Sequence, residues 1–251
     1  MTKWVLKGLA TGIRSTRYPA AAETAPGVSP GRPVATAVAD GDAAARLAAL
    51  CPTRALTAAG ERVAVTQARC VHCLRCAPGD GAARLDWDSG HEWASAPLAA
   101  ARDRLGRAFG RSLHVRFLDA GACGACISEA RQLNNPYYNM HRLGFFVTAS
   151  PRAADILLIA GPLTDAMRLP LRQTYQAMPA PKRVVAIGAC ALSGGVFGPS
   201  FVSAAGVAQD VSVDVPVDVM VPGCPPPPLA ILHGLLVAVE RKPPAPPDGE
   251  D

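Results

Sequence analysis

The sequence of 251 residues has few aromatic side chains, no dense block of charge and no long apolar run. Its apolar stretches stay below the roughly 18 residues of a membrane span, so we expect no transmembrane helix. The start, MTKWVLKGLATGIRSTRYP, lacks the long apolar core of a secretory signal. Aromatic residues make up 5% of the chain and the 25 basic residues are scattered, which leaves a nucleic-acid surface without support.

Nucleotide-binding motifs are also missing. The run GACGAC at residues 121–126 differs from the dinucleotide fingerprint G-x-G-x-x-G, and the chain has no Walker sequence. With 49% hydrophobic and 18% charged residues, the composition is typical of a globular protein with one sizeable domain or two smaller ones.

The sequence does contain eight cysteines, which form two groups of four on either side of residue 100. Without an export signal we expect a reducing compartment, where disulfides are rare. Clustered cysteines there more often indicate metal or redox chemistry. The eight positions are Cys51, Cys70, Cys73, Cys76, Cys123, Cys126, Cys190 and Cys224.

Three cysteines of the first group, in RCVHCLRC, have the C-x2-C-x2-C spacing that offers thiolates to three irons of a cubane cluster. In bacterial two-cluster ferredoxins the motif continues to a Cys-Pro pair, and that cysteine serves the other cluster. Here Asp80 and Gly81 stand at that place. Cys51 and Pro52 match the end of an earlier motif, whose three preceding cysteines would fall at Gly41, Ala44 and Leu47.

Every ligand of one cluster (41, 44, 47 and 80) is therefore missing, whereas every ligand of the other (51, 70, 73 and 76) remains. We interpret this stretch as a small ferredoxin-like α+β domain that has kept one [4Fe–4S] cluster, with ERVAVTQ as a strand of its hairpin. A four-cysteine zinc site and unligated structural thiols are the alternatives, although zinc usually takes two separated C-x2-C pairs. We expect His72, within the motif, to be a solvent-facing loop residue.

From about residue 112 the pattern changes to strands that alternate with helices, which predicts a largely parallel sheet. The predicted strands are HVRFLDA, ADILLIAGP, KRVVAIGAC and VDVMVPGC, and the predicted helices include LPLRQTYQAMP and PLAILHGLLVAVERK. Cys123, Cys190 and Cys224 each follow a strand directly. Ligands bind at the carboxyl ends of parallel strands.

We therefore expect these three cysteines and Cys126 to form one four-cysteine site. Glycines at 121, 124, 188 and 223 would let the backbone approach a cluster closely. A thioredoxin-like redox pair is the main alternative for Cys123 and Cys126, but it gives Cys190 and Cys224 no role.

Several motifs in residues 112–240 occur in the order of a known family. GACGACISE, RLGFFVTASPRAADILLIAGPLT, GACALSGGVFG and PVDVMVPGCPPPP resemble the small subunit of [NiFe] hydrogenases and the complex I subunit that carries the terminal cluster. GACALSGG is also similar to the small subunit of formate hydrogenlyase and other energy-converting, membrane-bound hydrogenases. Complex I subunits have adjacent cysteines, whereas the C-x2-C pair here resembles the hydrogenase branch.

The resemblance implies a flavodoxin-like sheet domain and a proximal [4Fe–4S] cluster bound by Cys123, Cys126, Cys190 and Cys224. Glu129 matches a family acid near the subunit interface; alternatively it is an acid favoured by a helix N-terminus. The leading segment WVLKGLATGIRSTRYP resembles that of the ferredoxin-like subunit of formate hydrogenlyase and complex I. The chain thus looks like a fusion of two neighbouring subunits, without the C-terminal cluster region of uptake hydrogenases.

The expected organisation has six parts. They are an amphipathic segment (1–19) for a partner or membrane surface, an Ala/Pro/Gly-rich linker (20–40), the ferredoxin-like domain (41–92), a connecting helix (93–111), the α/β domain (112–241) and a disordered tail (242–251). In the first part, apolar residues alternate with basic ones.

The resemblance implies an iron–sulfur, electron-transfer subunit of a membrane-associated [NiFe] hydrogenase or formate hydrogenlyase-type complex, on the cytoplasmic face. Two [4Fe–4S] clusters would relay electrons between a donor or acceptor and a catalytic large subunit, beside membrane-embedded subunits. We find no pattern of a substrate-converting site on this chain. The alternatives are a complex I-like subunit whose terminal cluster reduces quinone, and a zinc-stapled interaction scaffold.

Overall fold

The computed structural model of the protein describes residues 3–77, 84–96 and 112–246. Within these ranges we find no helix with the length and apolarity that crossing a bilayer requires. The helices are α1 (Lys3–Thr11), α2 (Gly41–Leu50), α4 (Ala125–Gln132), α5 (Asp165–Ala177), α6 (Ala189–Ser193) and α7 (Pro228–Ala238), with 3₁₀ helices η1 (Gln67–Arg69), η2 (Met140–Leu143), η3 (Pro151–Ala153), η4 (Val207–Gln209) and η5 (Val211–Val213). The strands are β1 (Arg32–Pro33), β2 (Thr36–Ala37), β3 (Leu56–Ala59), β4 (Arg62–Val65), β5 (Trp87–Asp88), β6 (Leu113–Asp119), β7 (Phe145–Val147), β8 (Ile156–Ala160), β9 (Arg183–Ile187) and β10 (Val219–Val221).

The main sheet, as far as the structure describes it, has five parallel strands in the order β10-β9-β8-β6-β7. Numbered within the domain this order is 5-4-3-1-2, which is the flavodoxin-like, doubly wound arrangement. The predicted α/β fold is therefore confirmed. Strand β7 was not among the predicted strands.

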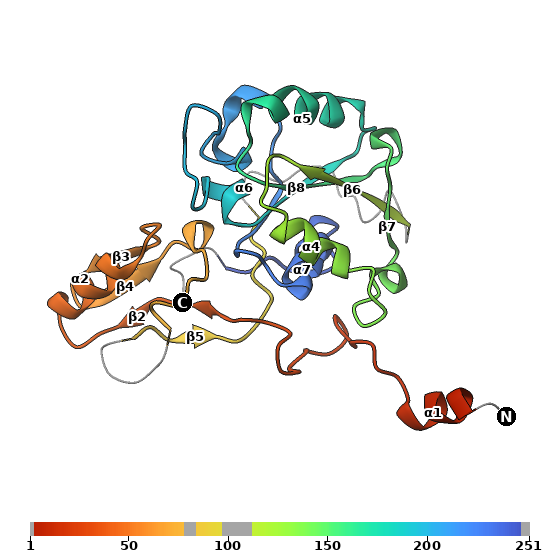
Figure 1. The fold of residues 1–251 in the computed structure, drawn as a ribbon, viewed down its shortest axis with the longest axis horizontal. Helices are drawn as coiled ribbons and strands as arrows, with labels where there is room; N and C mark the ends of the chain where they lie inside the picture. Colours follow the sequence, from red (N-terminus) through yellow and green to blue (C-terminus); the bar gives the residue numbers. More distant parts are fainter. Residues whose placement is uncertain (1–2, 78–83, 97–111, 247–251) are drawn as a thin grey trace.

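Both faces of this sheet are covered, so its central strands are buried along their whole length and are apolar except for Arg183 at the start of β9. All residues of β8 and β9 are buried. Alternate side chains point to opposite faces: Ile156 and Leu158 belong to the core that contains α7, whereas Leu157 and Ile159 belong to the core that contains Leu171 of α5. Figure 1 shows α5 on one side of the sheet and α4 and α7 on the other.

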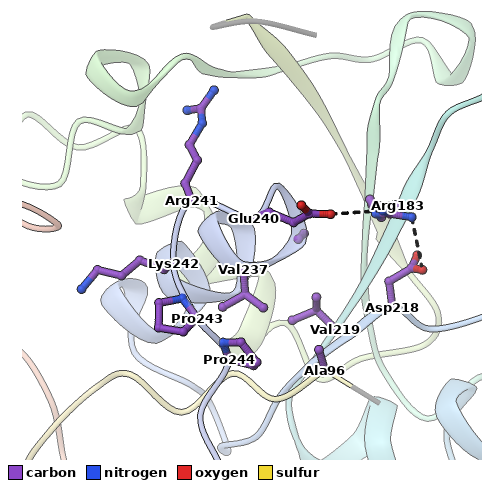
Figure 2. A pocket seen from close by; sticks show the side chains of 11 residues that line it. Ala96, Arg183, Asp218, Val219, Val237, Glu240, Arg241, Lys242, Pro243 and Pro244 are labelled. Carbon is purple, nitrogen blue, oxygen red and sulfur yellow. Dashed lines mark ion pairs between the residues drawn. The ribbon is translucent and has the colours of Figure 1, made fainter. Parts of the chain in front are cut away.

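A network of charged side chains lies at the end of the sheet where β9 and β10 begin. The Arg183 side chain is 6% exposed, and its guanidinium lies 3.9 Å from Asp218 Oδ1 and 4.0 Å from Glu240 Oε1. Figure 2 shows these pairs beside an open pocket of about 410 Å³, which Lys242 and Pro243 also line. A buried charge is costly unless it is paired, so we assign this network a structural role.

A second, smaller unit precedes this domain (Figure 1). In it, the described residues form an antiparallel sheet of order β2-β4-β3, against which α2 packs. Asp40 caps α2, because its Oδ1 accepts a hydrogen bond of 2.6 Å from Ala43 N. We call β2, β3, β4, α2 and the following loop to Cys76 the small module. Its α+β character and the strand within ERVAVTQ agree with the prediction.

Two predicted segments, the linker (20–40) and the connecting helix (93–111), differ from the structure in the residues that it describes. Strands β1 and β2 lie within 20–40 and pair with β5 and β4, so this part of the linker prediction is wrong. Residues 93–96 are extended, and Ser95 exchanges backbone hydrogen bonds with Met220. Both corrections reflect pairing with distant strands. The predicted disorder of the tail is wrong for residues 242–246, where Ala245 N donates to Ala94 O over 2.8 Å and Lys242 pairs with Glu92. Residues 97–111 of the predicted helix and 247–251 of the predicted tail lie outside the described residues.

The N-terminal segment crosses the α/β domain before it reaches the small module. Thr16 N donates to Tyr137 O (2.9 Å), and the Arg142 guanidinium donates to Tyr18 O. The Tyr18 side chain is buried. Beyond this crossing, helix α1 lies at the end of an extended arm (Figure 1), with Trp4 and Leu9 each 74% exposed.

Candidate iron–sulfur sites

The first four cysteines line one cavity of the small module. Cys51 ends α2, Cys70 follows η1, and Cys73 and Cys76 lie in the loop beyond. Cys70 and Cys76 are buried, whereas Cys73 is exposed. The structure thus brings together the four residues that counting along the ferredoxin motif grouped, and we call them the small-module quartet.

The loop between these cysteines winds through unusual backbone conformations. His72 (φ 48°) and Leu74 (φ 63°) both lie in the left-handed region, which residues other than glycine seldom adopt. Such conformations cost free energy and persist where the surroundings impose them. They turn the chain between successive cysteines.

Hydrogen bonds and burial act differently on the thiols of this quartet. Burial raises the pKa of Cys51, but hydrogen bonds from Thr53, Ala55 and Leu56 outweigh it, so that this pKa lies below its usual range. The Ala55 N–H donates to Cys51 Sγ over 3.2 Å. For Cys70, burial and then the nearby charges of the other three cysteines raise the pKa to about 11.

The prediction of a solvent-facing His72 is wrong. Its ring is mostly buried and lies edge-on to Trp93, with the ring centroids 5.5 Å apart, and to Trp87. Burial, together with the charge of Arg32, lowers the His72 pKa to about 4. The correction has a tertiary cause, since Trp93 follows the small module in sequence and packs back against it.

Apolar side chains occupy the positions where a second ferredoxin cluster would have its ligands. Ala44 and Leu47 are 0% and 2% exposed, and they share a core with Leu56 and Val63. Gly41 begins α2. Asp80, the fourth such position, lies outside the described residues. This part of the module is therefore an apolar core.

The second four cysteines lie where strands of the main sheet end. Cys123 and Cys126 stand at the turn from β6 into α4, Cys190 is in α6 directly after β9, and Cys224 follows β10. We call these four the sheet-edge quartet. Burial raises the pKa of Cys126 to about 12, and the charges of Cys224, Cys190 and Cys123 add to this effect. The charges of the other three cysteines thus reach Cys126, and a single four-cysteine site at this edge of the sheet stays a prediction.

Glycine is required beside two of these sulfurs. A Cβ atom on Gly188 (φ +87°) would lie 2.5 Å from Cys126 Sγ, and one on Gly195 (φ +56°) would lie 2.8 Å from Cys190 Sγ. Real Cβ atoms do not approach so closely, and the left-handed φ adds strain to any side chain. Gly188 was expected from the sequence; Gly195 was not, although the adjacent glycines of ALSGG indicate a close approach of the backbone there.

The donor sets are of the kind that cubane clusters take. Four thiolates in one place are the donor set of a cubane cluster, which binds each thiolate to a different iron. Among the described residues we find no group of three or more His, Cys, Asp or Glu side chains placed to hold a single metal ion. Burial, with the charges of Cys224 and Cys123, raises the pKa of Cys190 to about 11; metal ligands must be deprotonated, so binding a metal at this thiol would release its proton.

An exposed apolar loop adjoins the sheet-edge quartet. Val196, Phe197, Phe201 and Val202, which follow Cys190, are 67%, 58%, 92% and 47% exposed. Contiguous apolar surface of this kind marks an interaction site. The sequence analysis missed this loop, although apolar residues among Gly and Pro in GGVFGPSFV were visible. On α4, three residues after Cys126, burial raises the pKa of Glu129.

Comparisons with known proteins agree on the C-terminal part of the chain. The family model described as NADH ubiquinone oxidoreductase, 20 kDa subunit, matches residues 123–238. A probable membrane-bound hydrogenase subunit, mbhJ, of Pyrococcus furiosus is 42% identical over 139 residues, which are 55% of this chain and 80% of that protein. Formate hydrogenlyase subunit 7 of Escherichia coli is 39% identical over 142 residues, or 57% of this chain and 54% of that protein.

A solved structure is also similar in part. A chain of the membrane-bound sulfane sulfur reductase, an archaeal respiratory membrane complex, has 30% sequence identity and a TM-score of 0.47. The match covers 54% of this chain and 72% of that one.

Proposed function

The chain belongs to the family of the NADH ubiquinone oxidoreductase 20 kDa subunit, and we propose that it is the electron-transfer subunit of a membrane-associated hydrogenase or formate hydrogenlyase-type complex. Its relatives in Pyrococcus furiosus and Escherichia coli carry the names of such complexes. One observation supports this role most strongly: a single chain presents two complete cysteine quartets, one in each of its folded units.

In this proposal each quartet holds one [4Fe–4S] cluster, which supplies one-electron chemistry when it is bound. The protein's own contribution is to hold thiolates, exclude water and set the electrostatics around them. Backbone N–H groups at Ala55 and Val196 donate to Cys51 and Cys190 and favour their thiolate forms. Burial of Cys70 and Cys126 keeps water from the inner side of each site.

The proposed partners follow from the exposed apolar surfaces. A catalytic large subunit would cover the loop 196–202 and the sheet edge beside it. Helix α1, with Trp4, Leu6 and Leu9 exposed, would bind a membrane-embedded subunit or the bilayer surface, and one such helix anchors only weakly. The N-terminal half would then correspond to a separate ferredoxin-like subunit fused to the small subunit.

Metal analysis of the full chain, purified without oxygen, tests the proposal. We expect about eight iron and about eight sulfide per chain, two cubanes' worth, and no hydrogen evolution or uptake by the chain alone. Half that iron would mean that one quartet is empty. Zinc in stoichiometric amount, or hydrogenase activity of the isolated chain, would contradict the proposal.

Two variants separate the proposed contacts and serve as controls for each other. Phe201→Ser should abolish co-purification of the large subunit while membrane association of the chain persists. Leu9→Ser should release the chain and large subunit together from the membrane fraction. If both variants lose the large subunit equally, the assignment of the loop 196–202 is wrong.

A second candidate is a complex I-like subunit that passes electrons to quinone, which the matching family model favours. The C-x2-C spacing of Cys123 and Cys126 favours the hydrogenase branch instead. The co-purifying large subunit decides between them: nickel and two C-x2-C motifs indicate a hydrogenase, and their absence indicates another acceptor.

A further inference from the structure

The loops that carry the two quartets touch each other. Helix η1 leads directly into Cys70, and α6 contains Cys190. Ser193 Oγ, in the last turn of α6, donates a hydrogen bond of 2.8 Å to the carbonyl oxygen of Ala68 in η1. The two residues are 125 positions apart in sequence, so this bond joins the small module to the α/β domain.

Apolar contacts surround this hydrogen bond. Ala68 packs against the core formed by Ala186, Ala191 and Leu192, to which Met220 also contributes. The hydrogen bond is partly buried, and reduced access to water strengthens it relative to a fully exposed one. Ser193 Oγ also lies 3.1 Å from Ala189 O; the hydroxyl has one proton, and the contact between the two units is the shorter of the two.

The same hydroxyl is linked to both quartets by short routes. On one side, Ala68 is two residues before Cys70. On the other, Gly195 N donates to Ser193 Oγ over 3.4 Å, and Gly195 lies against Cys190, since a Cβ there would be 2.8 Å from its sulfur. Helix η1 is itself held by Gln67, whose side chain donates to Pro33 O (2.6 Å).

We propose that Ser193 is a positioning residue, which fixes the Cys70 loop against Cys190 and so sets the separation across which an electron passes between the two quartets. This inference rests on the proposed function, in which both quartets hold clusters. The exchange oxidises one cluster by one electron and reduces the other by one, and no bond forms or breaks. The hydrogen bonds of Ser193 involve Ala68 O, Ala189 O and Gly195 N, so its effect is on the distance and on the bonded route between the loops.

The test compares the full chain with three variants under anaerobic conditions. Ser193→Ala removes the bridge, and Ser193→Thr keeps a hydroxyl. Ser203→Ala is the matched control, because Ser203 Oγ donates to Gly198 O and pairs with Ser200 Oγ, so that its hydrogen bonds among the described residues stay within the α/β domain. For each protein, iron and sulfide content, the midpoint potential of each cluster, and the magnetic interaction between the two reduced clusters in the EPR spectrum are measured.

The wild-type chain, Ser193→Thr and Ser203→Ala should show the magnetic interaction. Ser193→Ala should keep both clusters and both potentials, but its interaction should weaken several-fold and electron exchange should slow. An unchanged interaction in Ser193→Ala overturns the inference, as does loss of a cluster or an equal effect of Ser203→Ala. A wild-type chain with two clusters and no interaction overturns the inference alone, whereas a chain without clusters overturns the proposed function.

Discussion

The chain brings the four cysteines of each quartet together in a different way. The small-module quartet comes from one stretch between Cys51 and Cys76, and its loop is shaped by His72 and Leu74 in left-handed conformations. The sheet-edge quartet is collected from three strand ends, where Gly188 lies directly against Cys126. A continuous loop can direct its side chains away from a cluster, whereas converging strand ends bring backbone against sulfur and require glycine.

The surroundings of the quartets differ as well. The sheet-edge quartet lies on a five-stranded sheet with a core on each face. The small module has one minor core, and Cys51 and Cys76 belong to it. The α/β domain would therefore hold a metal cluster on a fold that has two cores of its own, whereas the small module would depend on its cluster for part of its stability.

Removal of the metal should have the largest effect, and the effect should differ between the small module and the α/β domain. After oxidative loss of iron in the presence of a chelator, we expect the small module to unfold, because a unit of this size needs metal ligation to supplement its core. Strands β8 and β9 should keep their hydrogen-exchange protection, whereas β3 and β4 should lose it. Equal loss of protection in both units would show that they do not differ in this way.

A single methyl group should empty only the sheet-edge quartet. Gly188→Ala places a Cβ 2.5 Å from Cys126 Sγ, so we expect loss of about four of the eight irons and of one EPR signal. Gly198→Ala is the control, because it has a similar left-handed φ (+61°) and nothing within 4 Å of the new methyl. Loss of both signals in Gly188→Ala would mean that the quartets are not independent.

Cysteine substitutions test which cysteines bind the same cluster. Cys51→Ser and Cys73→Ser should remove the same EPR signal, since both side chains line one cavity. Cys126→Ser should remove the other signal and leave the first. If Cys51→Ser and Cys73→Ser remove different signals, the small-module quartet is wrongly composed.

The smallest effect should come from the strained loop. Leu74→Gly relieves a left-handed conformation at an exposed side chain, and glycine also makes the unfolded chain more flexible. These effects oppose each other, so we expect a gain in the free energy of unfolding below about 1 kcal/mol, with the cluster kept. Denaturant titration measures it; a loss of several kcal/mol would show that Leu74 makes contacts essential to the loop.

Several parts of the molecule could be predicted because the information is local. Strands β6, β9 and β10 are apolar runs that end at glycine and cysteine, so their spacing alone indicated a shared edge. The grouping of Cys51 with Cys70, Cys73 and Cys76 came from counting along one motif, and the cavity of the small module brings them together.

Other parts depend on contacts between distant segments and could not be predicted. Strand β7 has three residues and exists because it pairs with β6. Strand β2 lies in a Pro- and Gly-rich stretch and exists through its pairing with β4. The burial of His72 depends on Trp93, and the bridge from Ser193 to Ala68 depends on how the two units dock.

The crossing of the N-terminal segment over the α/β domain has a consequence for biosynthesis. The segment leaves the ribosome before the α/β domain, and the partner of Tyr18 is Arg142, made 124 residues later. Thr16 likewise waits for Tyr137, and Glu92 for Lys242, whose Nζ lies 2.7 Å from Glu92 Oε1. Domains generally fold in the order of synthesis, but here the N-terminal segment can make its contacts only after the α/β domain has been synthesised. Until the α/β domain has been made, the N-terminal segment that carries Thr16 and Tyr18 lacks these hydrogen-bond partners.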